Sequence, residues 1–192
     1  MAALVWVTTS NAVVGVSPDS VVYLDAARHI AAGDGAVFGS NLPGPGPDAG
    51  VVPLTHYPPG YPALLALIMR VTGASAESAA RVSGIGFAFL NVVLVAFIAL
   101  RVAAPALALM LAASFAVGIP LQLHIMAWSE PAFLTCTLAA LLSLATWSTD
   151  RERRRWLVAA ALCGALASVL RYPGVVLAGV AAVYIVGSAT PG

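Results

Sequence analysis

Hydrophobic residues fall into long runs along the chain, and short polar segments separate these runs. Three runs, at residues 82–100, 104–126 and 131–147, each have about the length that a helix needs to cross the hydrocarbon core of a bilayer. Pro131 stands in the favoured first turn of the third run, and Pro120 predicts a kink near the end of the second. The pattern therefore predicts three membrane-spanning helices in the middle of the chain.

The other apolar runs are shorter. Residues 2–16 include several polar side chains and predict a first span whose beginning is missing. Residues 62–72 reach only about 17 Å as a helix, so they predict an interfacial or re-entrant helix. Residues 156–170 and 173–187 are separated by the Arg171-Tyr172 pair and predict a tight hairpin. Taken together, the runs predict an all-α, polytopic transmembrane helix bundle of about six hydrophobic segments.

A long polar connection, residues 17–81, lies between the first two spans and is expected to carry interfacial helices. Within it, residues 20–32 show an apolar face and a charged face, which predicts an amphipathic helix that stops at Gly33. The charged side chains of this helix have the spacing of solvated ion pairs: Asp25, Arg28 and His29. Residues 33–53 are rich in glycine and proline and predict a segment without regular structure.

Composition strengthens the membrane interpretation. The 192 residues are 60% hydrophobic and 9% charged, with a mean hydropathy of +0.94, whereas soluble domains are about 25% charged. These values exclude a soluble enzyme, a disordered chain, a disulfide scaffold and a nucleic-acid binder. Cys136 and Cys163 both lie in apolar runs and are expected to be small buried hydrophobic residues.

The distribution of arginine predicts the orientation of the chain. Four arginines between positions 151 and 155 place that loop on the cytoplasmic side, and alternation places Arg101 there as well. The connections at residues 17–81, 128–130 and 171–172 then face the outside. We therefore expect a multi-pass protein of the cytoplasmic membrane whose remaining polar groups gather on the extracytoplasmic side.

The candidate functional residues belong to these outer connections: Asp19, His56, Tyr57, His124, Glu130 and Arg171. Each also has a structural interpretation. Asp19 is either the N-cap of the amphipathic helix or a catalytic acid, and Glu130 is either a dipole-compensating cap or an acid at a cavity mouth. Arg171 is either an interfacial arginine or a cation for a lipid-linked phosphate. His124 is either a hydrogen-bonded core residue or a ligand, and Asn91 and Gln122 are expected to make interhelical hydrogen bonds.

Five short motifs, in this order, resemble one enzyme superfamily. They are Ser17-Pro18-Asp19-Ser20 with Tyr23, Tyr57-Pro58-Pro59-Gly60-Tyr61-Pro62-Ala63-Leu64-Leu65, Ala79-Ala80-Arg81-Val82-Ser83-Gly84, Ser129-Glu130-Pro131-Ala132-Phe133, and Gly164-Ala165-Leu166-Ala167 running into Arg171-Tyr172. Their order and spacing resemble the GT-C superfamily of integral-membrane glycosyltransferases. Its bacterial proteins similar to dolichyl-phosphate-mannose–protein mannosyltransferases are the nearest in pattern.

The resemblance implies transfer of a sugar from a polyprenyl-phosphate-linked donor on the extracytoplasmic face. It implies that Asp19 is a general base or a metal-associated acid, with Glu130 as a supporting acid, and we extend it to a phosphate contact at Arg171. Further substrate contacts are expected at His56, Tyr57, Tyr23 and His124. Relatives often carry adjacent acids where Ser20 follows Asp19, so a divalent metal at Asp19 stays open.

The length of the chain bears on this interpretation. GT-C enzymes usually continue through more spans, so residues 1–192 are expected to be the N-terminal part of a larger enzyme. Two alternatives stay open: a non-catalytic truncated fragment or assembly subunit, and a transporter or lipid-handling membrane protein. An internal repeat and polar residues near the midplane would favour the transporter.

Overall fold

The computed structural model describes residues 1–10, 14–39, 50–150, 152 and 154–189 of the chain, without the side chains of residues 188 and 189. The described part is mostly helical. Its elements, in chain order, are α1 (Ala2–Ser10), α2 (Pro18–Ala32), β1 (Val37–Gly39), β2 (Val51–Pro53), α3 (Gly60–Thr72), α4 (Ala76–Ala99), α5 (Pro105–Phe115), α6 (Ile119–Ile125), α7 (Glu130–Thr149), α8 (Arg155–Leu170), the short 3₁₀ helix η1 (Tyr172–Gly174) and α9 (Val175–Ala189).

Two of these helices, α4 and α7, have the length and composition to cross a membrane, and α5 and α6 together make a third, bent candidate. The bend between α5 and α6 is 50°. It falls at Gly118, whose φ of 76° suits glycine, and Pro120 lies in the first turn of α6. The predicted kink near Pro120 is therefore present as a complete break in the helix.

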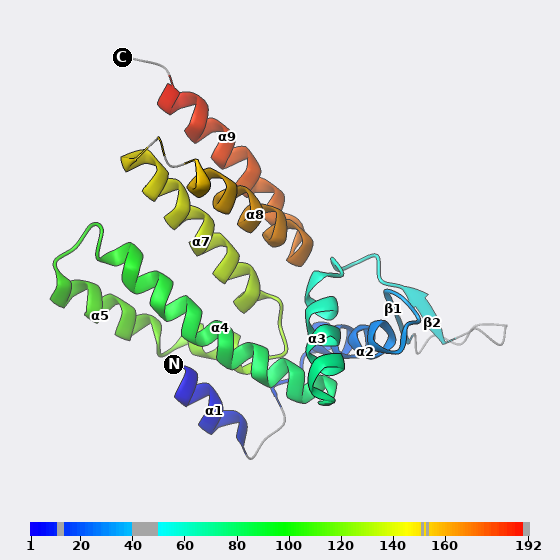
Figure 1. Cartoon of the computed structure of the whole chain (residues 1–192). Helices are drawn as coiled ribbons and strands as arrows, with labels where there is room; N and C mark the ends of the chain where they lie inside the picture. Colours follow the sequence, from blue (N-terminus) through cyan, green and yellow to red (C-terminus); the bar gives the residue numbers. More distant parts are fainter. Residues whose placement is uncertain (11–13, 40–49, 151, 153, 190–192) are drawn as a thin grey trace.

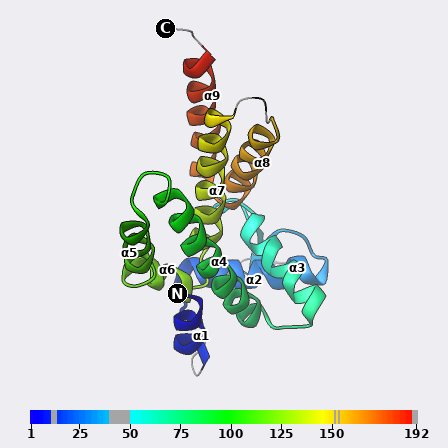
Figure 2. The same ribbon diagram turned by 60° about the vertical axis from the view of Figure 1, so that its left-hand side comes forward.

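Helix α7 lies between α4 and α8, and α9 returns beside α8 (Figure 1). Helices α5 and α1 pack against α4. The predicted hairpin is present, because η1 turns the chain between α8 and α9 and Gly174 lies directly on the backbone of Ala167. In both views α2 and α3 lie together at the end of the bundle where α4 and α7 begin and α8 ends (Figure 2).

The predicted amphipathic helix is present as α2. Ser17 caps its first turn, and Gly33, with a φ of 101°, ends it. Its charged face pairs as the spacing predicted, because Asp25 lies 3.9 Å from both Arg28 and His29. Its other face joins the main hydrophobic core, where buried residues from α2, α3, α4 and α7 meet: Tyr23, Leu24, Ala27, Tyr61, Leu65, Ala79, Ala80 and Ala132.

The prediction that residues 33–53 lack regular structure is wrong in part. Strands β1 and β2 form an antiparallel pair with Val37 opposite Pro53 and Gly39 opposite Val51. A side chain of α2 holds the pair in place, since the Gly39 amide donates to Asp25 Oδ2 at 2.6 Å. Residues 40–49 between the strands lie outside the described residues.

Candidate functional site

The first element of the site is the N-terminus of α2. Ser17 Oγ accepts a hydrogen bond from the Ser20 amide at 3.3 Å, and Pro18 occupies the first helical position. Asp19 is therefore not the N-cap, which corrects that interpretation of the sequence. Its half-buried carboxylate instead accepts a hydrogen bond from the Tyr57 phenol, with 2.7 Å between the phenol oxygen and Oδ1.

Tyr57 reaches Asp19 from the segment between β2 and α3. Its ring packs edge-on against Tyr23, with centroids 5.1 Å apart, and Tyr23 packs in the same way against Tyr61 at 5.3 Å. The bond to the Asp19 carboxylate raises the pKa of Tyr57 to about 12, because ionising the phenol would place two negative charges side by side. Tyr57 therefore stays a proton donor at physiological pH.

The second half of the site joins α7 to the end of α8. Glu130 lies in the first turn of α7 and forms an ion pair with Arg171, which directly follows α8. Both side chains are about one-third exposed, so water and solutes reach the pair. Arg171 Nη1 also lies 3.4 Å from Ser129 Oγ.

Tyr23 connects the two halves. Its phenol oxygen lies 3.2 Å from Ser129 Oγ, and its ring touches Tyr57. Burial is the main reason that the pKa of Tyr23 is raised. The charges of Asp19 and Glu130 raise this pKa further, and the charge of Arg171 lowers it. The structure thus brings these three charged groups together around one buried tyrosine. We call this group the Asp19–Arg171 cluster: Asp19, Tyr23, Tyr57, Ser129, Glu130 and Arg171.

Backbone contacts fasten the segment before α2 to the segment before α7. The Gly15 amide donates to the Ile125 carbonyl at 2.8 Å, and the Ala127 amide donates to the Gly15 carbonyl at 3.0 Å. The indole of Trp128 donates to Ser17 Oγ at 2.6 Å. These contacts fix Asp19 relative to Glu130, and sequence reasoning missed them together with the role of Ser129.

Two histidines predicted as substrate contacts do not join the cluster. His56 is exposed, and no hydrogen bond or ion pair ties it to another described residue. His124 is 1% exposed and belongs to the core, as its structural interpretation proposed. Its Nδ1 lies 2.5 Å from the Pro120 carbonyl oxygen, and its Nε2 lies 2.9 Å from Asn91 Nδ2.

Asn91 makes the interhelical hydrogen bonds that the sequence predicted. Besides His124, its amide donates to the Pro131 carbonyl at 3.0 Å and accepts from Thr135 at 2.7 Å. The network therefore ties α4 and α6 to the first turn of α7, one residue from Glu130. The side chain of Gln122 has no hydrogen-bond partner within the described part of the chain. Cys136 and Cys163 are free and half-buried.

The described residues do not fit a metal ion. No group of three or more histidine, cysteine, aspartate or glutamate side chains among them lies close enough to hold one. The partner of Asp19 is a phenol, and the partner of Glu130 is a guanidinium. The groups of the cluster that can take part in chemistry are therefore its two acids, its phenols and its arginine.

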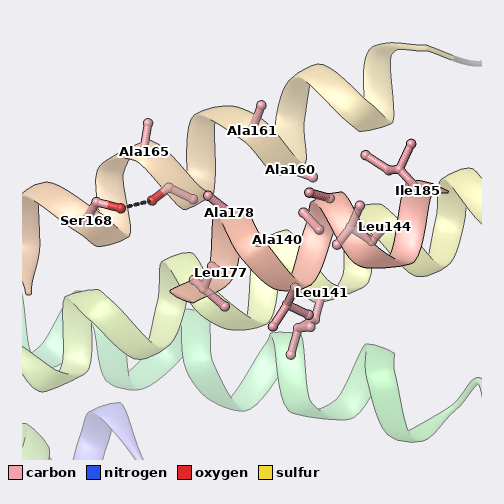
Figure 3. A pocket seen from close by; sticks show the side chains of 14 residues that line it. Ala140, Leu141, Leu144, Ala160, Ala161, Ala165, Ser168, Leu177, Ala178 and Ile185 are labelled. Carbon is pink, nitrogen blue, oxygen red and sulfur yellow. Dashed lines mark hydrogen bonds between the residues drawn. The ribbon is translucent and has the colours of Figure 1, made fainter. Parts of the chain in front are cut away.

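An apolar cavity of about 380 Å³ lies between α7, α8 and α9 (Figure 3). Small side chains of α8, such as Ala161 and Ala165, leave the space, and Leu141 and Leu177 contribute from the facing helices. Ser168 lines the cavity one turn of α8 before Arg171, with its hydroxyl turned to the Gly164 carbonyl. The cavity thus begins about one helical turn from the Asp19–Arg171 cluster.

Comparison of the chain with protein-family models, with curated proteins and with solved structures finds no match. The GT-C resemblance in the order of the motifs therefore stays a prediction. The geometry of the described residues places an acid held by a phenol, and a cation paired with a second acid, around one tyrosine at the end of an apolar helix bundle.

Proposed function

We propose that the chain transfers a sugar from a polyprenyl-phosphate-linked donor to a hydroxyl group of an acceptor. The observation that carries the proposal is the meeting of Asp19 with the Glu130–Arg171 pair around Tyr23. Such a transfer needs a base for the acceptor and a cation for the departing phosphate. The cluster offers one of each, and both are open to solutes.

The proposed reaction uses each charged group once. The acceptor oxygen bonds to the anomeric carbon of the sugar while its proton passes to the Asp19 carboxylate. The bond between the anomeric carbon and the phosphate oxygen breaks, and its electron pair leaves with the polyprenyl phosphate. Arg171 stabilises the negative charge that develops there, as a guanidinium suits phosphate oxygens. Glu130 is the supporting acid that holds Arg171 before the donor arrives.

The surroundings of the cluster support a lipid-linked donor. The cavity between α7, α8 and α9 is lined mainly by alanine, leucine, valine and isoleucine and begins one helical turn from Arg171. A donor with a polar head and an isoprenoid chain has this division into a charged and an apolar part. A free nucleotide sugar has no apolar chain for such a cavity.

We further propose that the cluster faces the extracytoplasmic side. The short connections at the opposite end of the helices carry arginines: Arg101 donates to Thr146 near the end of α7 at 2.8 Å, and Arg154 and Arg155 lie at the start of α8. Arginine in short loops favours the cytoplasmic side. Arg151 and Arg153, which also support this orientation, lie outside the described residues.

Cysteine labelling tests the orientation. In chains whose native cysteines are replaced by alanine, His56→Cys is expected to react with a membrane-impermeant maleimide added outside sealed, right-side-out vesicles. Arg154→Cys is expected to react only after the vesicles are opened. The reverse pattern would place the cluster in the cytoplasm and contradict the proposed side.

A transfer assay tests the reaction itself. The whole chain is reconstituted in vesicles with a radiolabelled polyprenyl-phospho-sugar, and label that reaches a water-soluble acceptor is counted. We expect transfer by the wild type and a loss of transfer in Asp19→Asn with normal membrane insertion. Asp25→Asn is the matched control, because Asp25 lies on the same helix outside the cluster and asparagine keeps an oxygen that can accept from the Gly39 amide. Equal transfer by the Asp19→Asn chain and the wild type would sink the proposal.

A further inference from the structure

We infer that Tyr57 is a positioning residue that acts through Asp19. Its phenol holds one carboxylate oxygen in place and leaves the other oxygen for the acceptor hydroxyl. This inference rests on the proposed function, and it changes the role that the sequence suggested for Tyr57, which was contact with the substrate. The reasons lie in how the phenol is held and in how many protons it can donate.

The segment that carries Tyr57 is fastened on both sides. Before it, the Leu54 amide donates to the Ala36 carbonyl at 2.9 Å, and the Thr55 carbonyl accepts from the Tyr172 phenol at 2.9 Å. After it, Gly60 lies so close to the backbone of Val169 that any side chain would clash there. The backbone that positions the Tyr57 phenol beside Asp19 is therefore held by contacts on both sides.

The hydrogen-bonding capacity of a phenol favours the positioning role, because its one proton goes to Asp19 and only its oxygen is left to accept a bond. A phenol carries one proton and can donate one hydrogen bond. Tyr57 donates its proton to Asp19 Oδ1 at 2.7 Å, so it has none for an oxygen of the sugar. Within the described part of the chain, Asp19 Oδ2 has no hydrogen-bond partner. An acceptor hydroxyl can therefore reach Oδ2 while Tyr57 fixes the plane of the carboxylate.

The groups around this pair are held by other elements. Tyr23 of α2 acts directly on Tyr57, and Glu130 of α7 and Arg171 after α8 act in turn on Tyr23. His56 precedes Tyr57 in the chain and is exposed. Substituting Tyr57 leaves all of these groups in place, so a change in kcat reports on the bond between Tyr57 and Asp19.

The test is the separate measurement of kcat and KM for sugar transfer by Tyr57→Phe. Without the phenol, the Asp19 carboxylate loses the hydrogen bond that fixes its plane, so it is less often aligned with the acceptor hydroxyl. At pH 7 we expect kcat to fall about tenfold while KM stays within about twofold, because the substrate loses no contact.

Tyr172→Phe is the matched control. It removes a phenol that braces the same segment through Thr55 but does not touch Asp19. We expect its kcat to stay close to that of the wild type. Equal kcat values in Tyr57→Phe and Tyr172→Phe, or a rise in KM alone in Tyr57→Phe, would overturn the positioning role. A wild type that transfers no sugar would instead refute the proposed function, and the two failures are thus distinct.

A spectroscopic measurement keeps the inference testable without activity. In chains with ¹³C-labelled tyrosine, the Cζ resonance of Tyr57 is assigned by its loss in Tyr57→Phe. The bond to Asp19 raises the pKa of Tyr57 to about 12, so this resonance is expected to stay unchanged as the pH rises to 10. In Asp19→Asn it should begin to titrate about one to two units lower. The same titration in both chains would show that Tyr57 does not hold Asp19, and would overturn the inference.

Discussion

Two glycines of α4, Gly84 and Gly86, allow a direct test of the contact between α4 and α6. Gly84 is buried, and a Cβ atom placed on it would collide with the carbonyl oxygen of His124 in α6. Gly86 lies two positions further along α4, is exposed, and has open space where a Cβ would stand. Alanine at either position gains the same helix propensity, so the difference between the two variants isolates the contact.

The expected magnitude follows from that geometry. Forcing a methyl group against a packed backbone costs about 1–3 kcal/mol, because α4 and α6 must move apart. Replacing glycine by alanine in a helix otherwise stabilises by roughly 0.5–1 kcal/mol. Gly86→Ala is therefore expected to be neutral or slightly stabilised, and Gly84→Ala to be less stable than Gly86→Ala by about 1–3 kcal/mol.

Thermal unfolding in detergent micelles, followed by circular dichroism, measures the difference. For a chain of this size 1 kcal/mol shifts Tm by roughly 2–4 °C, so Gly84→Ala should melt roughly 2–12 °C below Gly86→Ala. Equal melting temperatures would refute the reasoning, since they would mean that α6 does not lie against α4 at Gly84. Ile125, the last residue of α6, accepts the backbone hydrogen bond from Gly15 that helps to fix the segment before Asp19. The contact between α4 and α6 therefore also supports the site.

Two further changes test the buried network and the ion pair. Asn91→Leu leaves His124 Nε2 without its partner, so we expect a loss of about 1–3 kcal/mol in the free energy of unfolding. Titration with sodium dodecyl sulfate measures this loss, and an unchanged unfolding midpoint would contradict the hydrogen-bond network. Glu130→Gln removes the carboxylate that competes with phosphate for Arg171. We expect a short polyprenyl monophosphate to bind up to about fivefold more tightly, as measured by calorimetry. Weaker binding would mean that Glu130 assists the phosphate site.

Local patterns along the chain predicted much of the helical architecture. The amphipathic helix, its glycine stop and its charged face were predicted because all their determinants lie within one helix. The long apolar runs and the break near Pro120 followed for the same reason. The sequence left Asp19 open as either the N-cap or a catalytic acid, although Ser17 followed by Pro18 has the typical sequence of a cap and first turn.

Contacts between distant segments were beyond local patterns. The hydrogen bonds that join Gly15 to Ile125 and Ala127 are between backbone groups. Because nearly every residue carries such groups, the sequence does not indicate which of them pair. The pairing of β1 with β2 joins two runs of only three residues, which are too short to stand out in the sequence and which a side chain of α2 holds in place. His124 has the residue type of a ligand, and only its burial against Asn91 shows that it belongs to the core.

The candidate site also has some features that local patterns predict and others that only the three-dimensional structure shows. That Asp19, Glu130 and Arg171 share one end of the bundle followed from counting the connections between spans. That Tyr23 and Ser129 join them, and that Tyr57 holds Asp19, needed the three-dimensional structure. A polar pair such as Tyr57 and Asp19 is separated by 38 positions, and no periodicity relates the two.

The most direct test of the central claim is the ratio of sugar-transfer rates between Asp19→Asn and Asp25→Asn in the same vesicles. If Asp19 removes the proton of the acceptor, the Asp19→Asn rate should be lower by about 10²–10⁴-fold, the usual contribution of a general base. Equal rates in the two variants would contradict the claim that Asp19 is the base.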